Sequence, residues 1–423
     1  MKRRTLLVGG AGAVAAAAVA AVVLWRPEDR GAPHDAYFSQ LNGLLKREGP
    51  GHPVMLVDLD RMNHNIDVLT TSVGREKTYR VVVKSLPSVP LLRHVTARAR
   101  TAALMVFHQP FLNAVAEVFP QSDVLLGKPM PVAAAEQFYR MLGHTPFDAA
   151  GRLQWLVDTH DRLLQYQALA RKLGVSMRIN VEIDVGLHRG GLPEPEALDA
   201  LLATIASDDL LRLTGFMGYE PHLTGVNGGL EHPAVRDVLA RYRGFIERTR
   251  EHASGVTLDG LVFNGAGSHT LRIYERDRTM NDLSAGSGVV KPTDFDTFHL
   301  TDALPAVFIA TPILKRYDGL ELPGDPWAAD VMQRWDPNRR RLYFIYGGYW
   351  KAKFVSPSGV PNVLYHSTNQ EPVSTSESVD LAVDDYMFLR PSQSEHVMLQ
   401  FGDLRVVKDG ELVDRWPVFH QTG

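Results

Sequence analysis

Short apolar runs alternate with longer helical patterns between Val54 and about Gly288, and this alternation limits the fold more than any other feature. Repeated strand–helix units assemble into a parallel sheet, because each strand reaches its neighbour through a helical crossover. The economical result is an α/β protein built on a (β/α)8 TIM-type barrel, with its chemistry at the C-terminal ends of the strands. The runs expected to be buried strands are 54–57, 79–83, 102–106, 124–126, 153–157, 178–183, 213–217 and 260–263.

The pattern changes after about Val290, where strand-like runs are separated by Pro, Gly and Asp turns. This predicts a barrel over residues 45–290 and a smaller C-terminal β domain over 291–423, to which residues 31–44 contribute. Residues 325–341, which contain two prolines and three consecutive arginines, are expected to be a solvated loop. The strands expected in the β domain are 307–313, 342–346, 386–389, 396–401 and 404–407.

Composition removes several classes of function. The formal net charge is -3, whereas nucleic-acid binding relies on concentrated basic surface, so no nucleic-acid partner is expected. The chain has no cysteine, which excludes disulfides, thiol nucleophiles, iron–sulfur clusters and cysteine-ligated zinc. Any metal would be held by His, Asp or Glu.

Residues 1–30 are expected to be a targeting segment that stands apart from the fold. Lys2, Arg3 and Arg4 form a basic start, and residues 6–25 follow as an apolar run without a charged side chain. The arginine pair resembles the twin-arginine export signal, which predicts a periplasmic protein that folds around a cofactor before export. The alternative is an anchor in the inner membrane facing the periplasm, since a helix of about 20 residues spans roughly 30 Å.

Lys84 closes the apolar run 79–83 and is followed by Ser85, Leu86 and Pro87, where the strand must end. A lysine at a barrel mouth, with its stem against apolar neighbours, can act as a Schiff-base amine. An ordinary lysine that leaves a strand for solvent is the alternative.

Acidic residues interrupt another apolar strand, in the segment 181–191. Charges in a buried strand are costly unless they are paired, so Glu182, Asp184 and Arg189 are expected in a site or in a polar layer of the barrel. A half-exposed edge strand is the alternative.

The segment Asn264-Gly265-Ala266-Gly267-Ser268-His269-Thr270 follows the last expected barrel strand. Glycine lets backbone N–H groups approach a phosphate closely, and barrels often bind phosphate after their seventh and eighth strands. A glycine-rich turn without phosphate is the commoner occurrence.

In this order the segments resemble the fold-type-III pyridoxal phosphate enzymes of the alanine racemase superfamily, and especially the D-threonine aldolase and D-serine dehydratase branch. The resemblance covers roughly residues 54–401. It implies that Lys84 is the Schiff-base lysine, that Arg189 lies near the cofactor ring and that Tyr219 flanks the cofactor. It also implies a phosphate-binding turn and a homodimer in which two subunits complete each site. The segments that carry the resemblance are 57–65, 80–84, 181–191, 218–219, 264–270 and 394–396, and the cofactor contacts implied in the turn are Asn264, Gly265, Gly267 and Ser268.

Two departures from that branch concern the chemistry. Val82 stands where the branch has a histidine, and the branch's metal motif has no clear counterpart here. Only residues 417–420 lie near the expected place, with Thr422 at the position of a second ligand. Threonine is a poor neutral ligand, so a divalent metal is doubtful and His396 and His420 are its weak candidates.

The expected activity is that of a pyridoxal-phosphate-dependent lyase acting on a D-amino acid, by retro-aldol cleavage or by dehydration. An amino-acid racemase is the second interpretation, and a protein that binds the cofactor without turnover is the third. Besides Lys84, a second acid or base is needed, for which His396, Tyr219 and His222 are the candidates.

Overall fold

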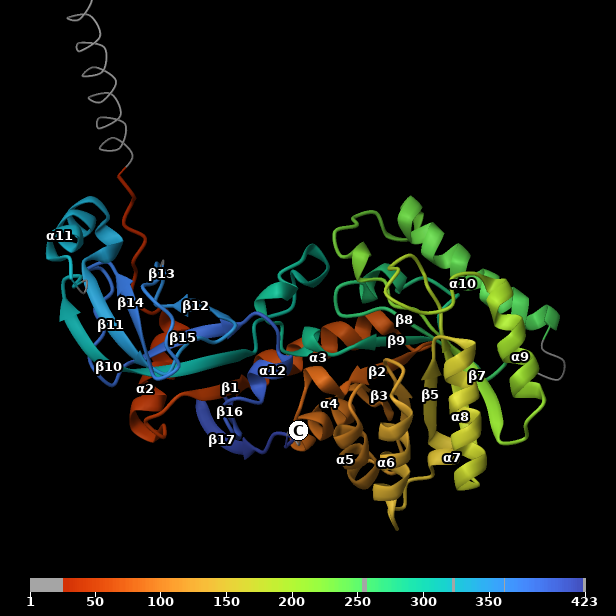
Figure 1. The fold of residues 1–423 in the computed structure, drawn as a ribbon. Coiled ribbons are helices and arrows are strands. Elements are labelled where there is room, and N and C mark those ends of the chain that lie inside the picture. The colour runs from red at the N-terminus through yellow and green to blue at the C-terminus, as the bar shows by residue number, and fades with distance from the viewer. Residues whose placement is uncertain (1–25, 253–256, 322–323, 361, 421–423) are drawn as a thin grey trace, which may run out of the picture. The chain divides into compact units, whose positions relative to one another are not determined.

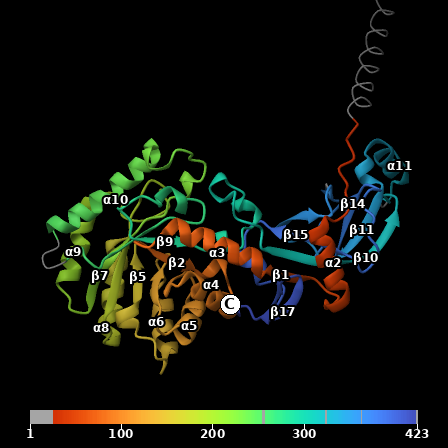
Figure 2. The same cartoon turned by 180° about the vertical axis from the view of Figure 1, so that it is seen from behind.

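The computed structural model describes residues 26–252, 257–321, 324–360 and 362–420 (Figures 1 and 2). They form two compact units. One unit, the barrel unit, contains residues 56–307, 392–409 and 413–420. The other, the β unit, contains residues 26–55, 308–391 and 410–412. The strands β1 (Val54–Asp58), β10 (Val307–Asp318) and β17 (Glu411–Trp416) have residues in both.

The barrel unit is built on a closed barrel of parallel strands in the sequential order β2 to β9. Seven of these strands lie at or near expected runs. Helices follow most strands and cover the outside of the barrel, as both views show. The strands are β2 (Thr78–Val82), β3 (Ala103–Val106), β4 (Asp123–Leu126), β5 (Leu153–Val157), β6 (Met177–Glu182), β7 (Leu211–Met217), β8 (Val262–Gly265) and β9 (Asp282–Ala285); the helices are α3 (Leu59–Val73), α4 (Val89–Ala99), α5 (Gln109–Val118), α6 (Val132–Leu142), α7 (Ala149–Arg152), α8 (His160–Leu173), α9 (Leu198–Ala206) and α10 (Pro233–His252).

The identity of the eighth barrel strand was predicted wrongly. The run 54–57 forms β1, which pairs in parallel with β16 (Leu404–Lys408) outside the barrel. The barrel closes instead through β9, which pairs with β8 and β2. The sequence of β9, Asp-Leu-Ser-Ala, is not an apolar run, because Asp282 pairs with a buried arginine on the neighbouring strand β2.

That arginine, Arg80, is almost fully buried and belongs to a polar layer inside the barrel. Its guanidinium lies 2.7 Å from Asp282 and 2.8 Å from Asp123, and Asp123 also pairs with Arg178 at 2.8 Å. Gln154 donates to Asp123 at 2.7 Å. Paired charges therefore replace apolar packing in this part of the barrel, as buried ions require.

The β unit is mainly antiparallel. Strand β10 pairs with β11 (Arg341–Tyr346) and with β15 (Tyr386–Pro391). Strand β11 pairs in turn with β14 (Gln370–Thr375), and β14 pairs with β13 (Asn362–Val363). Strand β12 (Ala352–Ser356) pairs with β15. Helix α2 (Ala36–Glu48) packs in the same unit. The buried apolar cluster of the β unit consists of Ile313, Tyr343, Ile345, Val373, Val379, Leu381 and Met387. A parallel barrel together with a separate, mainly antiparallel sheet confirms the expected fold class.

Three local expectations differ from the structure. Residues 325–341 contain helix α11 (Pro326–Trp335) and a short 3-10 turn, because Asp325 accepts from the N–H of Ala328 as an N-cap and Pro326 occupies the first turn. Residues 396–401 contain the short helix α12 (Glu395–Met398) and no strand. The boundary expected at residue 290 also differs, since the chain from Ser392 to Asp409 clusters with the barrel.

No helix among the described residues combines the length and apolar character that crossing a membrane requires. The expected targeting run at residues 6–25 lies outside the described part of the chain.

Candidate active site

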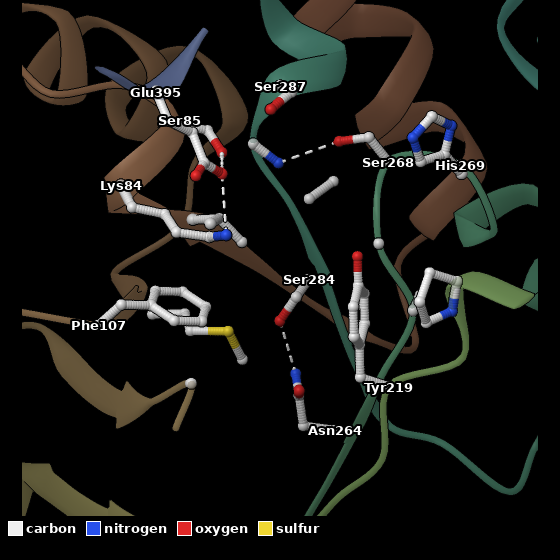
Figure 3. Close-up of a pocket in the computed structure, with 18 of the residues that line it drawn as sticks. Lys84, Ser85, Phe107, Tyr219, Asn264, Ser268, His269, Ser284, Ser287 and Glu395 are labelled. Carbon is white, nitrogen blue, oxygen red and sulfur yellow. Dashed lines mark hydrogen bonds and ion pairs between the residues drawn. The ribbon is translucent and has the colours of Figure 1, made fainter. Parts of the chain in front are cut away.

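A cavity of about 320 Å³ opens at the C-terminal ends of the barrel strands (Figure 3). We call it the barrel-mouth cavity. All its lining residues belong to the barrel unit. They include Lys84, Ser85, Phe107, Arg189, Tyr219, Asn264, Gly267, Ser268, His269, Ser284, Ser287, Gln393 and Glu395.

Lys84 reaches this cavity because β2 ends just before it. The chain continues as a single 3-10 turn, Val83–Ser85, and Ser88 then caps α4 by accepting from the N–H of Leu91. The Lys84 Nζ lies 2.8 Å from Glu395 Oε1 and 4.7 Å from the centre of the Phe107 ring. The amine is thus half-buried between one carboxylate, with which it forms an ion pair, and one aromatic face.

Tyr219 extends into the cavity from another side, from the segment that follows β7 (Figure 3). The Arg189 guanidinium lies 4.9 Å from the centre of its ring. Burial, with a smaller contribution from Glu220, raises the pKa of the Tyr219 hydroxyl. The phenol is therefore neutral and can donate a hydrogen bond at neutral pH.

The turn after β8 is joined to the turn after β9 by one serine. Ser268 Oγ accepts from the backbone N–H groups of Gly286 at 3.2 Å and Gly288 at 2.9 Å. A Cβ added at Gly267 would stand 3.0 Å from the Tyr219 ring, so the turn approaches that ring as closely as a side chain permits. The two turns line one side of the cavity with small residues and backbone.

His269 in this turn carries an unsatisfied polar atom. Its ring stacks on Phe295 with the centroids 4.1 Å apart. Its buried Nδ1 has no hydrogen-bond partner among the described residues. Burial lowers the pKa of His269, so the ring is neutral. In the tautomer that carries its proton on Nδ1, this atom is a donor without a partner beside small residues and glycines, and it fits an acceptor-rich group such as a phosphate.

Two residues of the turn after β8 that were expected to contact the cofactor, Asn264 and Gly265, have other neighbours. Asn264 lines the cavity, but its amide donates to Asp282 at 2.5 Å and to Ser284 at 2.8 Å and so ties β8 to β9. Gly265 is not among the lining residues; a Cβ there would collide with Met280 at 2.3 Å. Both positions shape the barrel wall behind the turn.

Glu220 was not singled out from the sequence, where it appears as one more acidic residue in a loop. It is completely buried and accepts from Thr270 Oγ1 at 2.7 Å and from the N–H of Ala266 at 3.4 Å. Burial raises its pKa to about 7, with these hydrogen bonds opposing the shift. The carboxyl group holds the turn after β8 from behind.

A second recess of about 590 Å³ shares Lys84, Arg189 and Glu395 with the cavity. We call it the side recess; it is also lined by Glu182 and His396. Burial raises the pKa of Glu182 to about 6, and the charge of Arg189 opposes the shift.

The remaining polar candidates are less central. His396 lines only the side recess and is exposed, and His222 is exposed and lines neither space. Asp184 accepts from the N–H groups of Gly186 and His188 and from the His188 ring, so it stabilises a loop.

The described residues contain no group of three or more His, Asp or Glu side chains placed to hold a metal ion. His420 is exposed near the end of the described chain, and Thr422 lies beyond it.

Sequence comparison identifies a family. Residues 57–290 match the family model described as alanine racemase, N-terminal domain. A curated relative, 3-hydroxy-D-aspartate aldolase of Paracoccus denitrificans (strain Pd 1222), is 24% identical over 147 residues, which are 34% of this chain and 36% of that protein. The match thus spans little more than a third of the relative's length.

Solved structures share the fold at low identity. D-threonine aldolase from Filomicrobium marinum has a TM-score of 0.66 and 16% identity over 87% of this chain and 94% of that one. D-threo-3-hydroxyaspartate dehydratase from Delftia sp. HT23 has a TM-score of 0.65 and 16% identity over 88% of this chain and 98% of that one. Alanine racemase of Clostridium difficile 630 has a TM-score of 0.64 and 14% identity over 86% of this chain and 97% of that one.

Proposed function

The chain belongs to the alanine racemase N-terminal domain family, and we propose that it is a pyridoxal-phosphate-dependent lyase acting on a D-amino acid. Members of this family depend on pyridoxal phosphate, and the similar proteins named above are two aldolases of D-amino acids, a dehydratase and a racemase. The observation that carries the proposal is the Lys84 amine, which lies in the barrel-mouth cavity together with Tyr219 and the turn after β8.

The residues present fit the cofactor. Lys84 provides the amine for its aldehyde, and the side of the cavity formed by Ser268, Ser287 and the glycines offers small residues to a phosphate. The unpartnered Nδ1 of His269 can donate to such a phosphate in the tautomer that carries its proton on this atom. Arg189 and Tyr219, packed on each other, form another side.

When bound, the cofactor would supply an electron sink for the charge that develops at the substrate Cα. The chain's own part is to hold and move protons. Lys84 Nζ can take a proton or return it, and Glu395 Oε1, 2.8 Å away, stabilises its protonated form. Tyr219, with its raised pKa, can act as an acid from another side of the cavity. His396 lies in the side recess and would reach only a substrate that extends there.

A lyase of aldolase or dehydratase type is the first candidate, and a racemase is the second. The second gains support from the absence, among the described residues, of a group of metal ligands, and from the separate sides from which Lys84 and Tyr219 enter the cavity.

Incubation of the purified protein with D- and L-amino acids, followed by chiral chromatography, separates the candidates. Glycine with an aldehyde indicates an aldolase, a keto acid with ammonia a dehydratase, and the opposite enantiomer a racemase. No turnover of any substrate, with the cofactor bound, would contradict the proposal.

Metal and subunit structure are part of the same proposal. We expect activity without a divalent metal, so a strong chelator should leave turnover unchanged. Loss of activity on chelation and recovery with manganese or zinc would instead support a metal-assisted lyase. We also expect a homodimer, which light scattering of the active protein would measure.

A further inference from the structure

Helix α11 of the β unit carries an apolar stripe that is partly exposed. Trp327, Val331 and Trp335 follow one another at intervals of four residues, so they share one face. Their exposed fractions are 73%, 45% and 40%. Ala329, on another face, is buried and attaches the helix to its own unit. An exposed apolar face with two tryptophans indicates a surface that meets a partner.

The first described residues of the chain are fastened to the C-terminal end of this helix. Arg26 Nε donates to the carbonyl oxygen of Trp335 at 3.1 Å. Asn338, which is buried, donates to the carbonyl oxygen of Glu28 at 2.7 Å and accepts from the N–H of Arg30 at 2.8 Å. Ser378 Oγ donates to Asp29 at 2.8 Å. The chain therefore enters the β unit beside α11 and is held there, as Figure 1 also shows.

The sequence immediately before Arg26 indicates which partner fits. Residues 6–25 are apolar and carry no charge, and no spacer separates them from Arg26. A run of this length is enough to cross a bilayer. Tryptophan is enriched at the boundary between lipid and water, and a basic side chain next to a spanning segment can extend to the headgroups. Basic residues 2–4, at the other end of the run, match the side that stays in the cytoplasm.

We propose that residues 6–25 anchor the chain in a lipid bilayer and that the stripe of Trp327, Val331 and Trp335 on α11 contacts that bilayer. The short connection through Arg26 holds α11 at that bilayer, and the tryptophans lie at its interface. The proposal concerns the β unit and is independent of the reaction catalysed in the barrel-mouth cavity.

The absence of cysteine makes the proposal directly testable. Val331→Cys introduces one thiol on the stripe. Val383→Cys is the matched control, because Val383 is also in the β unit and is 47% exposed. Val383 lies next to the segment whose Asp385 pairs with Lys46 of α2. That helix lies at the other end of the β unit from α11 in both views.

Each full-length variant is labelled with an environment-sensitive fluorophore and reconstituted into vesicles of phosphatidylcholine and phosphatidylglycerol. Two quenchers are then compared, a nitroxide lipid labelled near the headgroup and aqueous iodide. An interfacial helix buries its apolar face roughly 5–10 Å, so about a two-fold greater nitroxide quenching is expected at 331 than at 383, with weaker iodide quenching.

Equal, iodide-accessible signals at both positions would overturn the proposal, as would recovery of the mature protein in soluble form without residues 6–25. Protection of position 331 from both quenchers would show that a second copy or another protein covers the stripe, which also overturns it. If Val331→Cys does not fold, as judged by circular dichroism, Trp327→Cys replaces it on the same face.

Discussion

At the scale of single residues, the chemistry that we propose depends on one lysine and on the groups that surround it. Lys84 and Lys77 lie just beyond opposite ends of β2, so they can be compared directly. Lys84 enters the cavity, whereas Lys77 donates to the carbonyl oxygen of Glu275. The position of an amine relative to the strand end decides whether it can serve the cofactor.

The first prediction follows from this pair. Wild-type protein should be yellow, and borohydride should bleach the visible band and fix the cofactor to Lys84. Lys84→Ala should lose both the band and the reducible cofactor, and Lys77→Ala should retain them. Absorption spectra and peptide mass analysis after reduction provide the measurement. Covalent cofactor in Lys84→Ala would show that the assignment is wrong.

The second prediction concerns Glu220 and pH. Its pKa is raised from 4.5 to about 7 in the folded protein, so the folded state keeps a proton that the unfolded state has already released. The stability contribution is complete below about pH 4.5 and is lost as the pH rises to about 7. By the usual 1.36 kcal/mol per pKa unit, this loss amounts to about 3 kcal/mol.

Glu220→Gln cannot ionise and keeps an acceptor for Thr270, so its stability should lack this component of the pH dependence. Urea unfolding of both proteins between pH 4.5 and 7.5 gives the comparison. Parallel stability curves for the two proteins would mean that Glu220 is ionised at neutral pH.

At the scale of elements, the turn after β8 and the strand β9 decide the form of the cavity. Gly267→Ala places a Cβ 3.0 Å from the Tyr219 ring, and a ring that is largely buried has little room to move. Overpacking of this kind costs typically about 1–3 kcal/mol, so we expect about ten-fold weaker cofactor binding. Gly225→Ala is the control, because nothing lies within 4 Å of its added Cβ. Titration of both variants with pyridoxal phosphate measures the difference, and equal affinities would contradict this third prediction.

The fourth prediction concerns the ion pair that closes the barrel between β2 and β9. Asp282→Asn leaves the buried charge of Arg80 without its main partner, which should cost about 3–5 kcal/mol of stability. Asp67→Asn removes the partner of Arg98 in an exposed pair, for which about 0.2–1 kcal/mol is expected. Urea midpoints of the two variants test the difference. Similar losses in both would mean that the barrel does not depend on the buried pair.

At the scale of the whole molecule, we propose that residues 1–30 direct export of the protein. A twin-arginine signal is read by a receptor, so Arg3→Lys combined with Arg4→Lys should leave the precursor in the cytoplasm. Cell fractionation of the variant and the wild type measures this fifth prediction. Unchanged delivery of the variant would favour the general secretion route or a plain anchor.

The alternation of strands and helices was readable from local periodicity, and so was the position of Lys84, since a strand has to end at Leu86-Pro87. The glycine-rich turn after β8 was readable for the same reason, because its residue types restrict the backbone locally. Seven of the barrel strands followed from apolar runs, which report burial directly.

Contacts between distant residues required the tertiary structure. Strand β9 has no apolar run, because its Asp282 is stabilised by Arg80 from 202 residues away. Glu395 approaches Lys84 from the far end of the chain, and Glu220 acquires its raised pKa only when the barrel buries it. Periodicity reports how a segment meets its nearest neighbours in sequence, whereas the pairing of buried charges depends on which segments meet in space. That physical difference explains why the sequence predicted the barrel and the position of its lysine, but neither the strand that closes the barrel nor the contacts of Glu395 and Glu220.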